Sequence, residues 1–477
     1  MFQKDTIAAI ATGLTDSGIG IIRISGEKAV NIGNRLFRTP KGLKTLKNVT
    51  SHLLCYGYLL DKDISESDFS WKDYAIDEVM VVVMKAPRSF TGEDTVEIQC
   101  HGGVLVMKKI LESVLKNGAR MAEPGEFTKR AFLNGRIDLS QAEAVMDVIH
   151  SQNDYALTSS MNQLKGKLAE KIRELRAEII YEIAFIESAL DDPEHISLDG
   201  YCERLSEKID HLIEMIEKLL STTKDGRLIK EGINTVIIGK PNAGKSSLLN
   251  FILGEERAIV TEIAGTTRDV LQERVTLDGI GFNIIDTAGI RSTEDKVEKI
   301  GVEKAKQYAR IADLLLYVVD SSVALDESDR EIFPLLMGKK VIFLLNKSDL
   351  ENVVSSEDVE KLFHEFHLES NDFMIIRTSA KEENGLDEFK EKIKEMFFQG
   401  ELKGNNQLII TNERHGEALR DALSSLRLVR KSMEDGMPED FYSIDLMSAY
   451  QSLGRIIGEE VEDDLIEEIF SKFCMGK

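Results

Sequence analysis

Cysteine, proline and tryptophan are scarce in this chain of 477 residues, which contains four, seven and one of them respectively. Four cysteines do not form a disulfide framework in so long a chain, so we expect a reducing compartment. None of them lies in a Cys-x-x-Cys pair, which argues against a zinc ribbon. The low proline content argues against long extended linkers between domains.

Positive charge is also in deficit, since 60 Lys and Arg residues face 83 Asp and Glu residues and leave a formal net charge of −23. This balance excludes a generally basic nucleic-acid-binding coat, so any RNA contact must use a local basic patch. Two candidate patches are the segment 120–136, with four cations, and the predicted helix 165–176, with five. The acidic segment 432–477 should repel RNA and is better suited to helix packing or a protein partner.

Long apolar runs are missing as well. The longest, such as Val79–Met84 and Leu314–Val319, are too short to cross a membrane. The first residues show no signal-peptide cleavage site. Because 42% of the residues are hydrophobic and 30% charged, the chain has globular proportions, and we expect a cytoplasmic enzyme or switch.

The hydrophobic pattern changes along the chain. Residues 1–120 mix short apolar strands, such as Ile19–Ile24, with helical stretches. Residues 121–231 and 401–477 show helical spacing, including one apolar stripe from Leu164 to Ile186. Between them, in 232–400, apolar strands alternate with helices, which predicts a mostly parallel sheet. The predicted fold class is therefore multidomain α+β and α/β, with an α/β domain inserted into a discontinuous helical domain.

The strands of this inserted domain carry the first functional motif. They are expected at Thr235–Ile238, Phe282–Ile285, Leu314–Val319, Val341–Leu345 and Met374–Ile376. After the first strand, Gly239–Ser246 matches the phosphate-binding pattern GxxxxGK[ST] and precedes a helix start. Backbone N–H groups of such a loop surround phosphates, while Lys245 would neutralise β/γ oxygens and Ser246 would ligate Mg²⁺. The predicted phosphate contacts are Asn242, Ala243, Gly244, Lys245, Ser246 and Ser247.

Three further motifs follow later strands, where ligands bind on a doubly wound sheet. They are Asp286-Thr287-Ala288-Gly289, Asn346-Lys347-Ser348-Asp349 and Ser379-Ala380-Lys381. The first can hold Mg²⁺ through water and sense the γ-phosphate. The Asp349 carboxylate can accept two guanine N–H groups that adenine does not offer, which selects GTP over ATP. The third can offer a backbone amide to the guanine oxygen. Together the motifs predict a Ras-like GTP-binding domain.

The means of hydrolysis is less clear from the residues alone. A switch loop is expected at Thr261, Glu262, Ile263, Ala264, Gly265, Thr266 and Thr267. Thr267 is the candidate Mg²⁺ ligand. Ras-type GTPases orient water with a Gln after the second motif, but this chain has Ile290 there. Another residue must orient the water, or hydrolysis must be very slow. The candidates downstream are Arg291, Glu294, Asp295 and Glu298.

A set of motifs along nearly the whole chain resembles the MnmE (TrmE) family of tRNA-modification GTPases. They are Gly20–Gly26, Phe90–Asp94, His101–Gly103, Pro124–Phe127, Arg130–Asn134, Asp138–Ala144, Gly265–Asp269 and Phe473–Lys477. The resemblance implies a domain order of 1–120 for folate binding and dimerisation, 121–231 and 401–477 for the helical domain, and 232–400 for the G domain.

The resemblance also implies how GTP is hydrolysed. Family members hold K⁺ beside the phosphates, and the matching positions are Asn242, Thr261, Ile263 and Thr266. A fixed cation there offsets developing negative charge. Glu298 matches the water-orienting Glu of the family. The G domains of the family dimerise across their nucleotide faces in the GTP state.

For the rest of the chain, the resemblance implies a homodimer that binds a tetrahydrofolate one-carbon donor, in the 5-formyl or methylene form. The positions that match the family's folate contacts are Arg23, Glu97, Arg136 and Lys477, with Arg136 in place of a Lys found in some relatives. Cys474 matches a functional cysteine, although a lone cysteine is usually inert packing.

The family works with a flavoprotein, MnmG (GidA), which holds FAD, in a heterotetramer or larger assembly. Together they modify wobble uridine of certain tRNAs at C5. Two alternatives stay open for this chain. One is a ribosome-assembly GTPase without one-carbon chemistry, and the other is a non-enzymatic GTP-gated scaffold, which Ile290 would suit.

Overall fold

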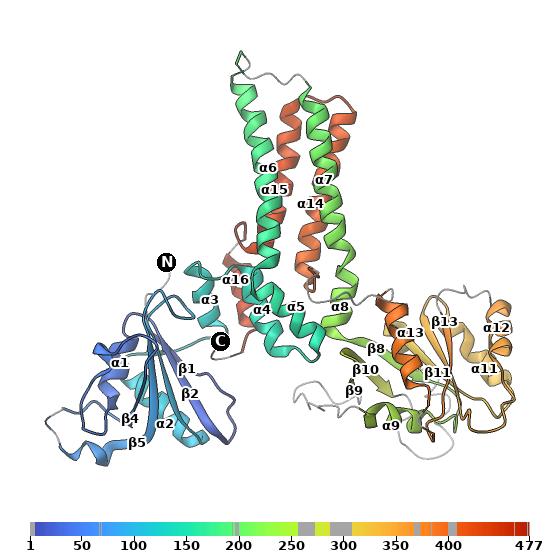
Figure 1. Cartoon of the computed structure of the whole chain (residues 1–477). Helices are drawn as coiled ribbons and strands as arrows, with labels where there is room; N and C mark the ends of the chain where they lie inside the picture. The colour runs from blue at the N-terminus through green and yellow to red at the C-terminus, as the bar shows by residue number, and fades with distance from the viewer. Residues whose placement is uncertain are drawn as a thin grey trace. The chain divides into compact units, whose positions relative to one another are not determined.

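The computed structural model describes residues 5–65, 67, 69–192, 194–195, 200–255, 272–286, 308–366, 373–382, 384–398, 408–461, 463–474 and 476. The chain divides into two compact units (Figure 1). The first consists of Met1–Met146, Gln163–Ala184 and Tyr450–Lys477, and the second of Asp147–Asn162 and Phe185–Ala449. No helix in the described ranges has the length and apolar character that crossing a bilayer requires.

The first unit contains a sheet with the strand order β3-β4-β5-β6-β2-β1-β7. Its strands are β1 (Ile7–Ile10), β2 (Ser17–Ser25), β3 (Phe37–Arg38), β4 (Leu54–Leu60), β5 (Ala75–Met84), β6 (Thr95–Gly102) and β7 (Arg120–Met121). Neighbouring strands run antiparallel, except that β7 is parallel to β1. Helices α1 (Ala29–Leu36) and α2 (Val104–Lys116) cover one face, where residues such as Ile22, Val81 and Met107 form the core. Short 3₁₀ segments at Leu46–Asn48 and Phe69–Tyr74 lie in the connections.

On the opposite face of this sheet, a helix packs at one end only among the residues that the structure describes. Side chains alternate between faces along a strand, so cross-strand partners share a face. One such row is Tyr56, Met80, Gln99 and Ile21, in which Tyr56 is 47% and Met80 42% exposed. At the β1 end, Phe127 of α3 (Glu126–Leu133) packs over this face in a cluster with Ile7 and Ala9. Among the described residues, the remainder of the face thus carries exposed apolar side chains, Tyr56 and Met80, beside the polar Gln99.

Helices complete the first unit. Residues of α4 (Leu139–His150) and α16 (Asp463–Ser471) share a hydrophobic cluster that contains Phe470 and Phe473. The stripe predicted from Leu164 to Ile186 is broken, because α5 (Asp154–Leu164) ends before α6 (Lys167–Asp191) begins. Gly166, between them, has φ +86°, a left-handed conformation that ends a helix. Leu164 therefore belongs to a different helix from Ile186. The boundary between the two units crosses α4, α5, α6 and α15 (Glu439–Ile457).

In the second unit, α7 (Tyr201–Ser221) and α14 (Glu413–Glu434) lie side by side, and α8 (Thr223–Glu231) follows α7 (Figure 1). The predicted apolar positions on α7, including Leu205, Ile209 and Ile216, are buried as expected. Ion pairs join the two long helices, with Arg427 Nη2 2.6 Å from Glu217 Oε1 and Arg430 Nη1 2.9 Å from Asp210 Oδ1.

The second sheet has the strand order β13-β12-β11-β8-β10-β9. The strands are β8 (Ile233–Ile238), β9 (Gln272–Leu277), β10 (Ile280–Asp286), β11 (Leu314–Asp320), β12 (Lys340–Asn346) and β13 (Phe373–Arg377). All five predicted strands are confirmed and parallel, whereas β9, an antiparallel edge strand, was not predicted. The mixed α+β and α/β fold class is thus confirmed. The domain boundaries stay a prediction.

Helices cover both faces of this sheet. They are α9 (Lys245–Glu255), α11 (Glu327–Ile332), a 3₁₀ turn at Phe333–Leu336, α12 (Ser356–Glu365) and α13 (Leu386–Phe398). Leu248 of α9 and Phe389 of α13 pack against Ile237 on one face. Phe363 of α12 and Phe333 pack with Tyr317 on the other. The carboxyl ends of the central strands, where the predicted motifs lie, therefore meet at one edge of the sheet.

Candidate functional site

The predicted phosphate-binding loop closely follows β8 and leads into α9. Two of its residues have left-handed backbone, Asn242 with φ +65° and Gly244 with φ +93°. A Cβ atom on Gly244 would lie 2.2 Å from Asn346 Nδ2, so only glycine fits this turn. Lys245 Nζ donates hydrogen bonds to the carbonyl oxygens of Gly239 at 2.8 Å and Lys240 at 2.7 Å. The loop therefore wraps around the ammonium group that was predicted to meet phosphate.

The loop is joined to the guanine motif by a buried amide. Asn346, the last residue of β12, is 2% exposed, and its Nδ2 donates to the Ala243 carbonyl oxygen at 2.9 Å. Its backbone carbonyl accepts a hydrogen bond from Ser321 Oγ at 2.8 Å. The predicted phosphate and base contacts thus belong to one hydrogen-bonded frame.

The base-recognition carboxylate is itself held in place. Asp349 Oδ1 accepts a hydrogen bond from Ser379 Oγ at 2.7 Å, and Lys381 Nζ lies 4.0 Å from Oδ2. The hydrogen bond from Ser379 and the charge of Lys381 lower the pKa of Asp349. The carboxylate is therefore charged at neutral pH, as an acceptor for two N–H groups must be.

Lys347 and Ala380 complete the described base-recognition segments. Lys347 has φ +61°, and its Nζ lies 2.5 Å from Asp320 Oδ2 at the end of β11. Burial would raise the pKa of Asp320, but the hydrogen bonds from Lys347 and Ser322 outweigh it and lower that pKa. Ala380 packs against the hydrophobic core under the sheet. Neighbouring strand ends thus anchor both base-recognition motifs.

Lys240 is a site residue that the sequence analysis missed. Its Nζ lies 2.7 Å from Asp329 Oδ2 and 3.0 Å from Asp326 Oδ2. Asp329 is 1% exposed, and its other oxygen accepts a hydrogen bond from Tyr317 OH at 2.6 Å. This brace fastens the phosphate-binding loop to the start of α11. The only signal in the sequence is the helix-capping spacing of Asp326 and Asp329.

Several predicted GTP-site residues lie outside the described ranges. They are Thr261, Glu262, Ile263, Ala264, Gly265, Thr266, Thr267, Thr287, Ala288, Gly289 and Glu298. Of the second motif, Asp286 is described as the last residue of β10, in register with Ile237 of β8. Ser246 and Ser247 lie in the first turn of α9, directly after Lys245.

In the first unit, the predicted folate positions gather around an aromatic ring. Arg23 and Glu97 are cross-strand partners on the partly open sheet face, with Arg23 Nε 2.7 Å from Glu97 Oε1. Their side chains are 16% and 19% exposed. The Arg23 guanidinium lies 5.9 Å from the centre of the Phe90 ring and 5.5 Å from that of Phe127. Arg136 lies 5.4 Å from the Phe90 ring and donates to the Ser89 carbonyl.

The end of the chain reaches the same place. Arg23 Nη1 donates to the Gly476 carbonyl oxygen at 3.2 Å, and the Gly125 amide donates to the Cys474 carbonyl oxygen at 3.4 Å. The Cys474 side chain is exposed. Lys477 lies outside the described residues. The structure thus brings Arg23, Glu97, Arg136 and the Cys474 segment together. It adds Phe90 and Phe127, which the sequence analysis named only as members of family motifs, without a role in the site.

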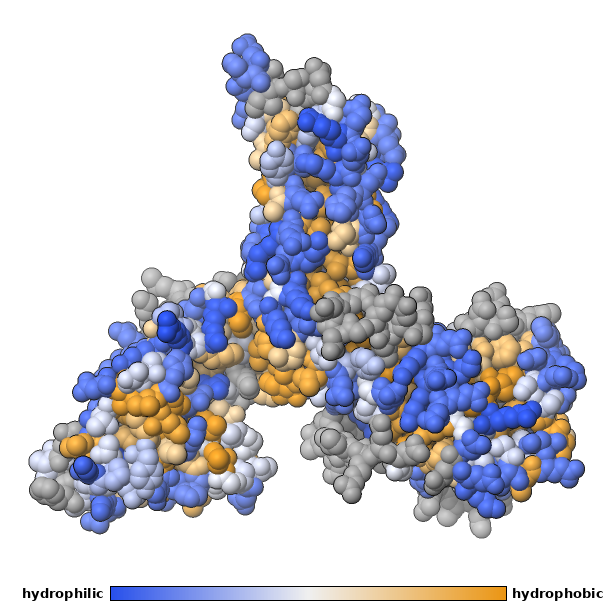
Figure 2. Space-filling model, in the orientation of Figure 1, coloured by the Kyte–Doolittle hydropathy of each residue, from blue (hydrophilic) through white to orange (hydrophobic). Residues whose placement is uncertain are grey.

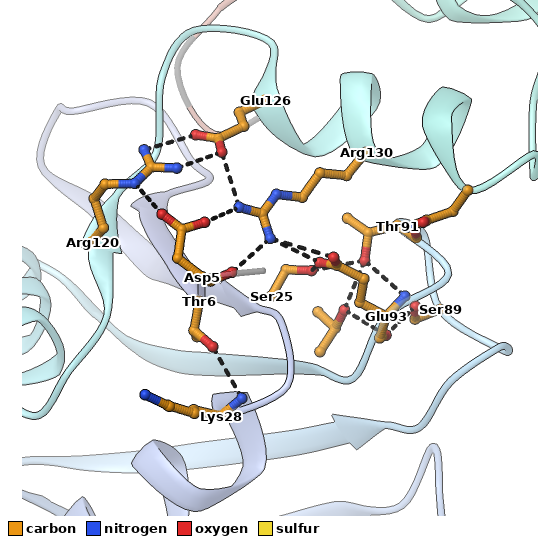
Figure 3. A network of polar contacts seen from close by, with 12 residues as sticks. Asp5, Thr6, Ser25, Lys28, Ser89, Thr91, Glu93, Arg120, Glu126 and Arg130 are labelled. Carbon is orange, nitrogen blue, oxygen red and sulfur yellow. Dashed lines mark hydrogen bonds and ion pairs between the residues drawn. The ribbon is translucent and has the colours of Figure 1, made fainter. Parts of the chain in front are cut away.

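The first predicted basic patch is largely neutralised. Figure 3 shows Arg120 and Arg130 in a network of carboxylates. Arg130 contacts Asp5 Oδ1 at 2.7 Å and Glu126 Oε1 at 3.0 Å, while Arg120 contacts Asp5 Oδ2 at 2.6 Å and Glu126 Oε1 at 2.7 Å. The Arg120 hydrogen bond is the main cause that lowers the pKa of Asp5. These arginines anchor α3 to the sheet and are not free for phosphate.

The second predicted patch, on α6, is also paired with acids. Lys171 Nζ lies 2.9 Å from Glu174 Oε2, and Arg173 Nη2 lies 3.3 Å from Asp138 Oδ2. Arg176 is buried and forms an ion pair with Glu459. Most cations of the two segments are therefore paired with acids, whereas Arg136 forms no ion pair among the described residues.

Known proteins are similar to this chain over its whole length, not only in the motifs. The family model described as "GTP-binding protein TrmE N-terminus" matches residues 6–136, and "MnmE helical domain" matches residues 139–474. Proteins named tRNA modification GTPase MnmE are 53% identical in Lachnoclostridium phytofermentans and 48% in Clostridioides difficile, over 100% of this chain and of each relative. In Bacillus subtilis the identity is 44% over 99% of this chain and 100% of the relative.

Solved structures match in part of the chain. The G domain of the T. maritima FeoB iron transporter is 27% identical, with a TM-score of 0.26, and the match covers 34% of this chain and 98% of that domain. Aquifex aeolicus Era bound to GDP and AlF4⁻ is 30% identical, also with a TM-score of 0.26, over 41% of this chain and 67% of Era. The full-length identities and the two family models, which agree with the assembled GTP motifs, show that this chain belongs to the MnmE (TrmE) family.

Proposed function

We propose that this chain hydrolyses GTP and uses the turnover in the modification of wobble uridine in tRNA. The observation that carries the proposal is the single frame in which Asn346 joins the phosphate-binding loop to the guanine motif, in a chain related over its full length to tRNA modification GTPases. Asp349 selects the guanine base, and Lys245 neutralises the phosphates.

Two ions suit this site. Mg²⁺ would be held by Ser246 and Thr267, with Asp286 acting through water. K⁺ would be held by Asn242, Thr261, Ile263 and Thr266. The described part of this set fits such ions in its chemistry, since Ser246 in the first turn of α9 carries a hydroxyl group and Asn242 in the loop carries a side-chain carbonyl oxygen. Bound there, the ions supply positive charge that offsets the charge developing on the phosphates. Glu298 orients the attacking water, which Ile290 cannot do.

The first unit binds a reduced folate. Arg23, Glu97, Arg136 and Lys477 would hold it, and when bound it supplies the one-carbon unit. The described residues fit this ligand, because the guanidinium of Arg23 and the carboxylate of Glu97 offer a donor and acceptor pair beside the flat Phe90 ring. Cys474 lies on the segment that closes onto Arg23, and its exposed thiol is available to act as a nucleophile.

The assembly we propose is a homodimer that acts with a flavoprotein of the MnmG (GidA) kind, which would hold FAD. The open face of the first sheet supports a dimer, since Leu54, Tyr56 and Met80 are each more than 40% exposed. Figure 2 shows apolar surface on this unit. Burying such a surface against a second copy removes it from water. G domains associate in the GTP state and complete the hydrolytic site.

The first test is a mass analysis of wobble-uridine nucleosides from cells that lack this protein, with and without its restoration. Loss of the C5 substituent, returned by the wild type, supports the proposal. Unchanged nucleosides would favour a ribosome-assembly GTPase, which co-sedimentation with ribosomal subunits would then reveal.

A second test addresses hydrolysis. We expect multiple turnovers of GTP that are faster in K⁺ than in Na⁺, and a loss of at least about tenfold in Glu298→Ala, the size of one missing water-orienting contact. Glu294→Ala is the matched control from the same charged segment. Equal rates in both salts would contradict the K⁺ site. The absence of turnover in either salt would leave a GTP-gated scaffold.

A further inference from the structure

A pocket of about 430 Å³ opens beside the predicted folate positions of the first unit. Its lining includes His52, Arg88 and Arg136, together with the apolar side chains of Met84 and Phe90. Of these, only Arg136 is one of the predicted folate contacts. A cavity of this size accommodates a ligand fragment rather than a macromolecular surface.

The charge of this pocket is unusual for the molecule. The chain carries 83 acidic residues, yet no Asp or Glu lines the pocket. Among the residues that the structure describes, neither Arg88 nor Arg136 forms an ion pair, so both guanidinium groups can meet an outside anion. His52 Nδ1 lies 2.9 Å from Ser51 Oγ, which leaves the other ring nitrogen pointing away from that contact. Three nitrogen-bearing side chains without a described carboxylate partner form an anion-binding set.

Phe90 connects this pocket to the Arg23 and Glu97 pair. The ring lines the pocket and lies 5.4 Å from the Arg136 guanidinium and 5.9 Å from that of Arg23. A ligand whose flat portion lies near Arg23 and Glu97 can therefore extend past Phe90 toward Arg88. The portion that reaches the pocket should be anionic and chain-like.

We propose that His52 and Arg88 form a subsite for the amide-linked carboxylates of an oligo-γ-glutamyl tail, so that this protein prefers folates with several glutamates over the monoglutamate. The inference rests on the proposed folate function and adds to it the residues that determine tail length. Each added γ-linked glutamate brings one more carboxylate and lengthens the tail, so a longer tail can pair with spaced cations that the two carboxylates of the monoglutamate do not reach together.

The test measures the equilibrium affinity of the full-length protein for 5-formyltetrahydrofolate and for its triglutamate. We expect wild type to bind the triglutamate about tenfold more tightly, the size of one added charge-assisted hydrogen bond. Arg88→Gln and His52→Gln should each reduce that preference to about twofold or less. Arg88→Lys should restore part of it, since it keeps the charge. Lys47→Gln, which changes an exposed cation outside the pocket, serves as the control.

The outcomes separate the two proposals. If wild type binds both folates equally, the tail subsite is wrong and the folate site stands. If neither folate binds, both proposals fail. If Arg88→Gln weakens tRNA binding while the triglutamate preference persists, the pocket is an RNA contact and the tail subsite is again wrong. Thermal unfolding of each variant distinguishes a lost contact from a lost fold.

Discussion

At the scale of single residues, the charge state of Asp349 is central to the base selection that we propose for the G domain. Ser379 and Lys381 hold its carboxylate in place and lower its pKa, so it stays an acceptor at neutral pH. An amide at this position would keep the shape but replace one acceptor with a donor.

We therefore expect Asp349→Asn to weaken GTP binding by at least about a hundredfold, because one guanine N–H would then face another donor. The same variant should gain affinity for xanthosine triphosphate, whose ring carries a carbonyl where guanine has its amine. Titration with both nucleotides measures this exchange. Asp387→Asn, at a fully exposed position on α13, is the control. Unchanged GTP affinity in Asp349→Asn would show that the base is read elsewhere.

At the scale of elements, α3 is held to the first sheet by charge. Burial would raise the pKa of Glu126, but hydrogen bonds from Arg120, the Glu123 amide and Arg130 outweigh it and lower that pKa. The pKa of Asp5 is lowered as well, mainly by the hydrogen bond from Arg120. Since both folded-state pKa values lie below the unfolded ones, the stability that they contribute is present above about pH 4.3 and is lost as pH falls through the folded values.

We expect Glu126→Gln to destabilise the first unit by about 2 kcal/mol at pH 7, the range of hydrogen bonds between charged groups. The difference from wild type should shrink as the pH is lowered from 7 to 3, because the native Glu126 carboxylate loses its charge as the pH falls through its folded-state pKa. Urea unfolding at the two pH values measures this. Glu112→Gln on α2, which removes an exposed ion pair with Lys116, should change stability by less than about 0.5 kcal/mol. An equal deficit for Glu126→Gln at both pH values would mean that its charge is not what anchors α3.

Elements with a local signal were predictable. The five parallel strands are short apolar runs, and the phosphate-binding loop is contiguous, so pattern alone located them. The β9 strand, Gln272–Leu277, lies at a sheet edge. It begins with three polar residues and alternates only from Arg274 on, so it gives no such run. The break between α5 and α6 lies at Gly166, which has a left-handed backbone conformation. The apolar spacing predicted one continuous helix there, because a single glycine does not interrupt such a pattern.

Residue patterns could not predict the contacts between segments that are distant in the sequence. Arg23 and Glu97 are 74 positions apart, so only the family resemblance assigned them to one site. Phe90 is not polar, and no role in that site was predicted for it. Lys240 occupies a variable position of the phosphate-binding motif, so the motif predicts no role for it. Its partners Asp326 and Asp329 have the spacing of an ordinary helix cap, which gives no sign of a contact with the loop. The pairing of most cations in the two basic segments was not predictable, because their acidic partners, such as Asp5 and Asp138, are remote in sequence or lie outside the segments considered.

At the scale of the whole molecule, the chain divides into two compact units, and the sheet of each unit has its own hydrophobic core. The predicted nucleotide-binding residues all lie in the second unit, Asp147–Asn162 and Phe185–Ala449, so a bound nucleotide would stabilise that unit directly.

We expect thermal unfolding of the full chain to show two transitions. GDP at a hundred times its Kd should stabilise the second unit by about 2.7 kcal/mol, which raises the Tm of one transition by about 5 °C or more. Scanning calorimetry with and without GDP measures this, and ATP is the control nucleotide. A single transition that shifts as a whole would show that the units unfold cooperatively.

The hydrogen bond from Arg23 to the Gly476 carbonyl has a consequence for protein synthesis, because its two residues are 453 positions apart. The first sheet can fold while the ribosome is still translating, since its strands end at Met121. The contact made by Arg23, however, forms only after Gly476 has left the exit tunnel. A nascent chain or a truncated product would thus lack one contact of the proposed folate site, and premature capture of a folate by unfinished chains would then be disfavoured.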